Sequence, residues 1–371
     1  MTEQDMNESV DDLGRLLAAA RDVMVVDDVT EGAPPGNSVR LRGRLLLPSD
    51  EAYDRLAEAM RPLGRTPLLR KDAADQGGEG VEVLAMPVTF AQTRPRVGLS
   101  LVLFTLTVLS CLFAGAQMIE GLEQINLNLL DGAPFALSLL AILTAHEFGH
   151  YLVARRLGSP TSLPYFLPLP FGPFGTLGAV ITARVPFRNR RHLLAVGAAG
   201  PLAGLAAALP ILLYGLSLSG VHPLPAGGYQ MEGNSLLYAA LKFLMFGKWL
   251  PSAGEDVFIH AVAYAGWAGL LVTGLNLMPA GQLDGGHIIY ALFGARGVRT
   301  STWIVLAALA ALTFIWSGWG LWLALVFLFG RLHDRPLDEI TELTHGQRRL
   351  ALAMVAIFLL VFTPIPLTIV P

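Results

Sequence analysis

The chain has 371 residues, 53% of them hydrophobic and 15% charged, and its mean hydropathy is +0.53. Soluble domains usually carry about a quarter charged residues, so this composition predicts a protein that crosses a lipid bilayer several times. The formal net charge of −3 argues against a nucleic-acid partner, and a single cysteine excludes an internal disulfide and a cysteine-rich zinc site. Positions 1–20 are acidic and lack a long apolar core, so we expect no cleavable signal peptide.

Residues 1–95 are polar, and we expect them to form a small cytosolic α/β module with a regulatory or docking role. Ser49–Met60 is predicted to be a helix, with Ser49 as its N-cap and two acidic residues at its positive end. Short strands are predicted at 23–26, 39–47, 67–69 and 81–85, with turns at 32–36 and 77–80. No catalytic cluster occurs here, so docking and ligand sensing both remain open.

Residues 96–371 are dominated by apolar runs, and we expect a membrane-embedded α-helical domain there. The runs cover 97–118, 134–154, 193–218, 257–278, 301–330 and 350–370. The fifth run is too long for one upright span and is interrupted at 317–320, so it is interpreted as two short spans. Residues 232–251 are apolar but contain Glu232, Lys242 and Lys248, which leaves an amphipathic or a partly inserted helix open. The predicted fold is a polytopic helical membrane protein with about six or seven spans.

Basic residues predict the orientation of these spans, because they are enriched on the cytoplasmic side. Arginine clusters flank the runs at 94–96, 155–156, 188–191, 296–299, 331–335 and 348–349. All of them fall on one side if the N-terminus is cytoplasmic and residues 301–330 form a hairpin. We therefore expect a multi-pass protein with a cytoplasmic N-terminus, in the plasma membrane of a prokaryote.

The second apolar run contains His146-Glu147-Phe148-Gly149-His150, which is an H-E-x-x-H sequence. Residues four apart share one face of a helix, so His146 and His150 can bind one zinc ion together. Glu147 lies beside them and is positioned to act as the general base of a metalloprotease. Ionisable side chains inside a membrane span are costly and are usually functional, which favours the metal site over a chance motif.

A catalytic zinc site needs a third protein ligand and one open position for water. The candidate lies in the segment from Asn276 to His287, which follows the fourth apolar run. Asp284 is a carboxylate in a glycine-rich break, and an ordinary Asp-Gly turn is the alternative interpretation from spacing alone. His287 is an alternative ligand on the same grounds.

Together, the two motifs resemble those of the site-2 protease family of intramembrane metalloproteases. That family combines H-E-x-x-H in one span with N-x-x-P-x-x-x-L-D-G in a later one, and Asn276, Pro279, Leu283, Asp284 and Gly285 match the second motif. The resemblance implies that Asp284 is the third zinc ligand and that Asn276 is a catalytic-site residue. It covers residues 95–371, and no PDZ-like insert separates the motifs, so it points to the PDZ-less members.

The resemblance implies hydrolysis of peptide bonds in transmembrane substrates by a zinc-activated water, as in regulated intramembrane proteolysis. We expect one Zn²⁺ per chain, a transmembrane protein substrate and the bilayer as partners; the oligomeric state stays open. A metal-ion transporter or binding protein is the main alternative, because intramembrane histidine and aspartate also mark ion pathways. A membrane zinc protease of another type and an inactive scaffold are two further alternatives.

Two segments between the motifs carry secondary predictions. Residues 161–187 are rich in proline and glycine and become β-like from Gly175 to Val185, so Gly178–Ile181 is a candidate clamp for an unwound substrate; a plain reentrant loop is the alternative. Gly197, Gly200 and Gly204 have the spacing of close helix packing, and we expect them to have no catalytic duty. His260 is expected to be a packing residue.

Overall fold

The computed structural model describes residues 3–72, 75, 80–90, 96–120, 126–159, 161–182, 185–225, 227–330 and 335–370. The chain forms two compact units. The first contains Met1–Thr93, Arg184–Leu193 and Arg335–Thr344, and the second contains Arg94–Ala183, Leu194–Asp334 and His345–Pro371. Each unit is described separately below.

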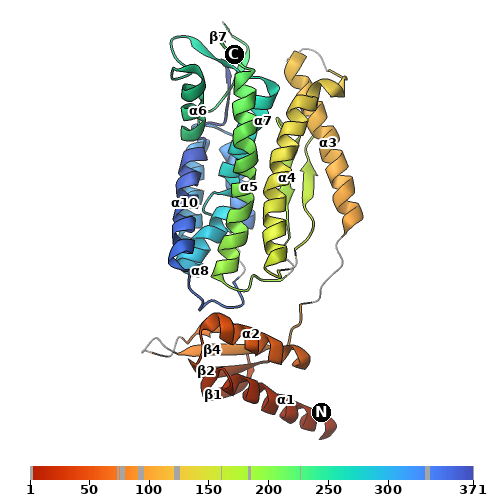
Figure 1. Ribbon diagram of the computed structural model, residues 1–371, viewed down its shortest axis with the longest axis vertical. Helices are drawn as coiled ribbons and strands as arrows, with labels where there is room; N and C mark the ends of the chain where they lie inside the picture. Colours follow the sequence, from red (N-terminus) through yellow and green to blue (C-terminus); the bar gives the residue numbers. More distant parts are fainter. Residues whose placement is uncertain are drawn as a thin grey trace. The chain divides into compact units, whose positions relative to one another are not determined.

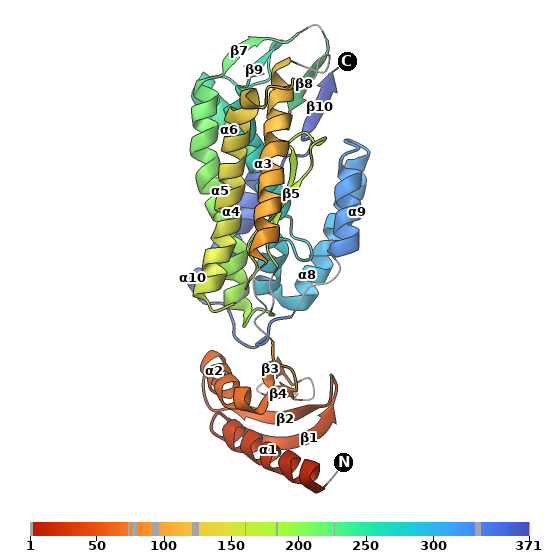
Figure 2. The same ribbon diagram turned by 90° about the vertical axis from the view of Figure 1, so that its right-hand side faces the viewer.

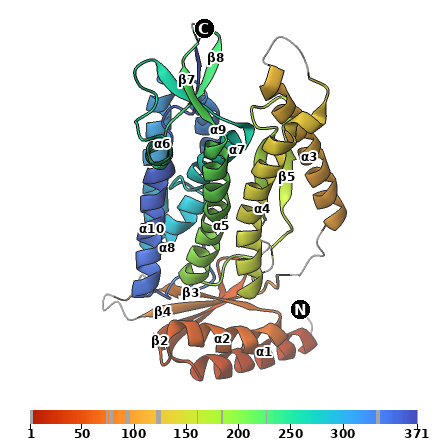
Figure 3. The ribbon, with the colours of Figure 1, turned by 45° about the horizontal axis from the view of Figure 1, so that its top comes forward.

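The first unit is a four-stranded antiparallel sheet with two helices. The strands are β1 (Met24–Ala33), β2 (Ser38–Leu45), β3 (Thr66–Lys71) and β4 (Val81–Met86), in the order β1-β2-β4-β3. Helices α1 (Glu3–Arg21) and α2 (Ser49–Met60) lie side by side against this sheet, and the short helix η1 (Arg61–Leu63) follows α2 (Figure 3). Leu16 of α1, Leu56 of α2 and Leu41 of β2 are fully buried in the shared core.

The helix expected at 49–60 and the strands expected at 39–47, 67–69 and 81–85 agree with this unit to within two residues. The strand expected at 23–26 is longer, because β1 continues to Ala33, and α1 was not expected. The prediction that Ser49 caps α2 is wrong. Pro48 occupies the N-cap position without a side-chain cap, and the Ser49 hydroxyl instead hydrogen bonds to the Thr341 hydroxyl at 2.8 Å. The turn expected at 77–80 lies outside the described residues, apart from Gly80.

The second unit is mainly helical. Its helices are α3 (Val97–Glu120), η2 (Leu129–Gly132), α4 (Ala133–Arg156), α5 (Arg190–Ser217), α6 (Leu236–Phe246), α7 (Ala261–Asn276), α8 (Asp284–Thr313), α9 (Trp319–Phe329) and α10 (His345–Val361) (Figures 1 and 2). The first residues of α5 belong to the first unit. Three antiparallel strand pairs complete it: β5 (Tyr165–Pro168) with β6 (Thr176–Val180), β7 (Gly220–Pro223) with β9 (Glu255–Phe258), and β8 (Tyr229–Glu232) with β10 (Leu367–Val370).

Three of the described helices are long and apolar enough to cross a membrane: Val97–Met118, Leu129–Arg156 and Arg190–Ser217. Shorter apolar helices occupy Leu236–Phe246, Ala261–Asn276 and Trp319–Leu328. The first three predicted spans agree with the long helices to within a few residues. These helices support a membrane protein.

Three predicted runs, 257–278, 301–330 and 350–370, differ from the helices that form. The fourth begins only at Ala261, because residues up to Phe258 pair in β9 and His260 caps the helix by accepting a hydrogen bond from the Val262 N–H at 3.2 Å. The last ends at Val361 instead of 370, because Pro364 and Pro366 cannot continue a helix and the chain then pairs with β8. The break expected at 317–320 overlaps the gap between α8, which ends at Thr313, and α9, which begins at Trp319. The helix before this break starts at Asp284 and not at the expected residue 301.

Candidate metal centre

Helix α4 carries the H-E-x-x-H residues in its second half. His146 and His150 lie one turn apart on the same face, and their Nε2 atoms are 3.2 Å apart. His146 is 2% exposed and Glu147 is 5% exposed, so both ionisable side chains are inside the protein. Helical geometry alone brings the two imidazoles together, because four residues make slightly more than one turn.

Asp284 begins α8 and completes the cluster. Its Oδ2 atom lies 3.3 Å from His146 Nε2 and 3.2 Å from His150 Nε2. The two glycines that follow allow this approach, because a Cβ at Gly285 would overlap the Leu277 carbonyl and a Cβ at Gly286 would overlap that of Gly281. The structure thus brings together three residues that lie far apart in the sequence. His287, the alternative ligand, is not part of this cluster of described residues.

The three side chains fit a zinc ion. Ligands held tetrahedrally about 2.0–2.1 Å from zinc stand roughly 3.3–3.4 Å from one another. The three observed separations, 3.2, 3.2 and 3.3 Å, match that spacing. Two imidazoles and one carboxylate are also a donor set that zinc uses in catalytic sites, where the fourth position stays open.

Asn276, at the end of α7, lies beside the cluster. Its Nδ2 atom is 3.3 Å from His146 Nε2. Asn276 therefore lies at the centre where the sequence interpretation expected it.

The Val196 carbonyl of α5 contacts the cluster and was missed from the sequence. It lies 2.7 Å from His150 Nδ1. A carbonyl oxygen only accepts hydrogen bonds, so Nδ1 carries the proton and the Nε2 lone pair faces His146 and Asp284. No residue type marks such a contact, because every residue has a carbonyl.

The β5–β6 hairpin lies along α3 and α4. Tyr165 pairs with Val180 and Phe166 with Ala179, while the Ser110 hydroxyl of α3 donates to the Gly175 carbonyl at 2.5 Å. The β-like run expected from Gly175 to Val185 is shorter in the structure, because β6 ends at Val180 and residues 183–184 lie outside the described part. Part of the candidate clamp, Gly178–Val180, is therefore a strand.

Comparison with known proteins agrees with this geometry. The family model described as "Peptidase family M50" matches residues 134–315, and this range contains the H-E-x-x-H residues of α4, Val196 and Asp284. This match and the relatives below support the site-2 protease family. No solved structure matches it.

The chain is similar to several plant proteins. It is 32% identical over 269 residues to "Probable zinc metalloprotease EGY2, chloroplastic" of Arabidopsis thaliana, which covers 71% of this chain and 47% of the relative. It is 34% identical over 250 residues to the protein of the same name in Oryza sativa subsp. indica, covering 65% and 44%. Over 375 residues it is 29% identical to "Probable zinc metalloprotease EGY1, chloroplastic" of Oryza sativa subsp. japonica, covering 90% and 63%.

The chain thus spans about half the length of the first two relatives. The family match and the names of the relatives support a metalloprotease and indicate a zinc cofactor. The same names contradict one expectation. They place the relatives in chloroplasts, so the expected prokaryotic plasma membrane, with its cytoplasmic N-terminus, is wrong. Arginine distribution reports which side of a membrane a loop occupies, but it does not identify the membrane.

Proposed function

We propose that the chain is an intramembrane zinc endopeptidase that hydrolyses peptide bonds of transmembrane protein substrates. The observation that carries the proposal is the convergence of His146, His150 and Asp284 to separations of 3.2–3.3 Å within a helical membrane protein. These three side chains would hold one Zn²⁺ per chain. When bound there, zinc lowers the pKa of a water molecule and polarises a substrate carbonyl.

Glu147 is the proposed general base. It takes a proton from the attacking water and later gives it to the leaving amine. Its burial beside the two histidines limits competition from bulk water. Asn276 is proposed to donate a hydrogen bond to the substrate carbonyl as negative charge develops there, because its amide nitrogen already reaches His146.

The edge of β6 is the proposed contact for the substrate backbone. Helical peptide bonds are shielded, so a membrane-spanning substrate must become extended before cleavage. Among the described strands β6 pairs only with β5, which leaves a second edge for strand addition by a substrate. Ala179→Pro should abolish cleavage with normal zinc content, whereas Ala179→Ser should cleave normally. Full activity of Ala179→Pro would remove this role.

We further propose about six or seven spans, built from α3, α4, α5, α7, α8, α9 and α10, with residues 1–95 as a docking or regulatory module. The names of the plant relatives support a chloroplast membrane as the location. A metal-ion transporter is less well supported. A transport path needs polar groups along several spans, whereas the described residues hold one such metal-binding group.

The decisive experiment compares membrane protein fragments in cells that carry the wild type or Glu147→Gln. The variant should retain zinc and accumulate uncleaved substrates, since the amide cannot take a proton. Glu31→Gln, on an exposed position of β1, is the matched control and should process normally. Wild-type processing by Glu147→Gln would contradict the general-base role, and zinc-free purified wild type would contradict the metal site.

A further inference from the structure

Helix α5 packs unusually closely against α4 at the candidate metal centre. A Cβ on Gly149 of α4 would come within 2.6 Å of the Ala199 carbonyl oxygen and 2.9 Å of the Ala203 Cβ. Real Cβ atoms essentially never come that close to another atom, so only glycine fits at this crossing. The backbone of α5 therefore lies directly against the helix that carries both histidines.

Two glycines of α5 leave room for the histidine rings themselves. A Cβ on Gly200 would overlap the His150 ring at Nε2, the nitrogen that faces the cluster. A Cβ on Gly204 would come within 2.9 Å of His146 Nδ1 and 3.1 Å of its Cβ. The two imidazoles thus occupy space that a larger side chain at position 200 or 204 would fill.

The carbonyl of Val196 lies on the same face of α5, one turn before Gly200. Its 2.7 Å contact with His150 Nδ1 is independent of the glycine packing, because it is a directional hydrogen bond and not a question of available space. Metal-bound histidines usually donate their second ring N–H to such an acceptor, which fixes both the tautomer and the ring orientation.

We propose that Val196, Gly200 and Gly204 form a positioning surface that holds the two histidines in their metal-binding orientation. The sequence interpretation assigned the glycines to helix packing alone. This inference rests on the proposed metalloprotease function. These residues touch the ligands and not the substrate, so they are positioning residues.

A pure packing role predicts a different response to substitution. Gly215, further along α5, is the matched comparison, since a Cβ there would overlap the backbone nitrogen of Ala263 in α7. Backbone cannot move aside, so Gly215→Ala should destabilise the fold. The His150 ring is the mobile end of a side chain, so in Gly200→Ala it can rotate away without disturbing the backbone.

The test uses the full chain purified in detergent, with zinc removed by a chelator and then titrated back. In Gly200→Ala we expect at least a tenfold loss of zinc affinity, with the unfolding temperature of the metal-free protein unchanged. In Gly215→Ala we expect a lower unfolding temperature, with the zinc affinity of the folded protein unchanged. Wild-type zinc affinity in Gly200→Ala, or equal loss of metal-free stability in both variants, would overturn the proposal.

A second measurement keeps the proposal testable if Gly200→Ala fails to fold. Nitrogen-15 NMR of the histidine rings in the zinc-loaded wild type should find the His150 proton on Nδ1, and zinc bound through Nδ1 with the proton on Nε2 would overturn the role of Val196. Gly204→Ala should bind zinc more weakly than wild type, and unchanged binding would overturn the role of that glycine. Glu147→Gln should bind zinc normally, so loss of activity in that variant reports on the proposed function alone.

A separate set of contacts lies within the first unit, between residues 1–95 and the two segments 184–193 and 335–344. The stretch 337–339 adds to the sheet at β3: Leu69 N–H donates to the Leu337 carbonyl at 2.9 Å, and Glu339 N–H donates to that of Leu69 at 3.1 Å. On the other side of this stretch, Leu337 and Asp338 N–H groups donate to the carbonyls of Phe187 and Arg188, at 2.9 and 2.7 Å. Two distant parts of the sequence thus extend one sheet.

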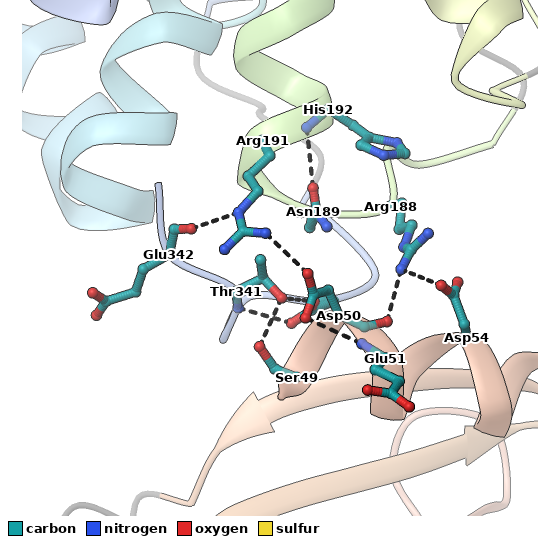
Figure 4. A network of polar contacts seen from close by, with 11 residues as sticks. Ser49, Asp50, Glu51, Asp54, Arg188, Asn189, Arg191, His192, Thr341 and Glu342 are labelled. Atoms are coloured by element: carbon teal, nitrogen blue, oxygen red, sulfur yellow. Dashed lines mark hydrogen bonds and ion pairs between the residues drawn. The ribbon is translucent and has the colours of Figure 1, made fainter. Parts of the chain in front are cut away.

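Charged and apolar contacts accompany this strand addition. Arg191 Nη1 lies 2.9 Å from Asp50 Oδ2, and Arg188 Nη2 lies 2.8 Å from Asp54 Oδ2, so the first turns of α2 face two arginines (Figure 4). Leu337 is 6% exposed within the core of the unit. The surface formed by β3 and the start of α2 therefore matches segments 184–193 and 335–344 in charge, in backbone hydrogen bonding and in apolar contact.

We infer that the docking surface formed by β3 and the start of α2 is specific for loops 184–193 and 335–344 of this same chain. The module then acts within its own chain and does not present this surface to a separate partner. The first of these segments includes the first turn of α5, and the second ends directly before α10.

Hydrogen exchange of the full chain tests this inference through a charge swap. Asp50→Arg and Arg191→Asp should each speed exchange in both loops at least several-fold, and the double variant should restore slow exchange. Arg55→Glu, which breaks an exposed ion pair with Glu51 on the same helix, is the control and should leave both loops protected. Unchanged loop exchange in both single variants, or no recovery in the double variant, would overturn it.

Discussion

Lys242 provides the sharpest test of the stability of the second unit. Its side chain is 0% exposed, and its Nζ atom lies 3.3 Å from Asp256 Oδ1 and 3.8 Å from Glu232 Oε1. Tyr238 completes the surroundings, because Nζ lies 4.9 Å from the centre of its ring and its hydroxyl donates to Glu232 at 2.8 Å. One buried cation thus faces two buried carboxylates.

Replacing Lys242 with methionine keeps most of the side-chain volume and removes the charge. Removing one partner of a buried ion pair typically destabilises a protein by about 3–5 kcal/mol, because the other charge stays buried without compensation. Asp256 keeps a 2.8 Å hydrogen bond from the Val257 N–H, and Glu232 keeps the one from Tyr238. These bonds offset only part of the loss, so we expect about 3–5 kcal/mol for Lys242→Met.

Unfolding in detergent, followed by circular dichroism, measures this loss. Lys248→Met is the control, because the ion pair of Lys248 with Glu255 is solvent-exposed and such pairs contribute about 0–1 kcal/mol. Adding Glu232→Gln and Asp256→Asn to Lys242→Met should recover much of the stability, since no buried charge then remains. If Lys242→Met unfolds within about 1 kcal/mol of wild type, the buried charges do not interact as described.

Three further predictions concern the metal centre and the first unit. Asp284→Ala should lower zinc occupancy, measured by atomic absorption, and unchanged occupancy would turn attention to His287. Asn276→Ala should retain zinc and lower kcat more than it raises KM on a cleavable substrate; a change in KM alone would contradict its proposed role. Burial raises the pKa of the Asp338 carboxyl above its ordinary value of 3.8, so folding favours the protonated form and stability should fall as pH rises from about 4 through the raised pKa. Asp338→Asn should remove that part of the pH dependence of unfolding; an unchanged profile would contradict the assignment.

Motif spacing predicted much of the candidate site because helical geometry is regular. His146 and His150 had to share a face once residues 133–156 formed a helix. The position of Asp284 beside them was different, since spacing alone left an Asp-Gly turn and His287 open. The family resemblance favoured Asp284, and the structure brings that residue to the two imidazoles.

Prediction was weaker where tertiary contacts override local signals. The hydroxyl of Ser49 was expected to cap α2 but hydrogen bonds to Thr341, almost three hundred residues away in the sequence. Helix α1 was missed because acidic residues dominate its start, although Leu13, Leu16, Leu17 and Ala20 have the spacing of a helical apolar face. Lys242 looked like part of an amphipathic helix, because nothing local indicated two distant carboxylates.

Helix α5 best illustrates the limit of sequence interpretation. It contacts the zinc-ligand histidines through a backbone carbonyl and through glycines, which have no side chain to indicate the contact. The Val196 carbonyl has no residue-type signal, and glycine spacing has the same appearance whether the opposing group is a helix backbone or a histidine ring. Gly200 and Gly215 differ only in the group that a Cβ would meet, which is the His150 ring at Gly200 and the Ala263 backbone at Gly215. The same helix begins at Arg190 among the residues of the first unit and continues to Val196 and the metal centre in the second. A residue held by the docking module and a group held against a zinc ligand therefore lie on one continuous helix. We accordingly expect Arg191→Asp to alter zinc affinity as well as hydrogen exchange in the two loops, and the added Asp50→Arg substitution to restore both. If zinc affinity is the same in the wild type, the single variant and the double variant, the two ends of α5 act independently.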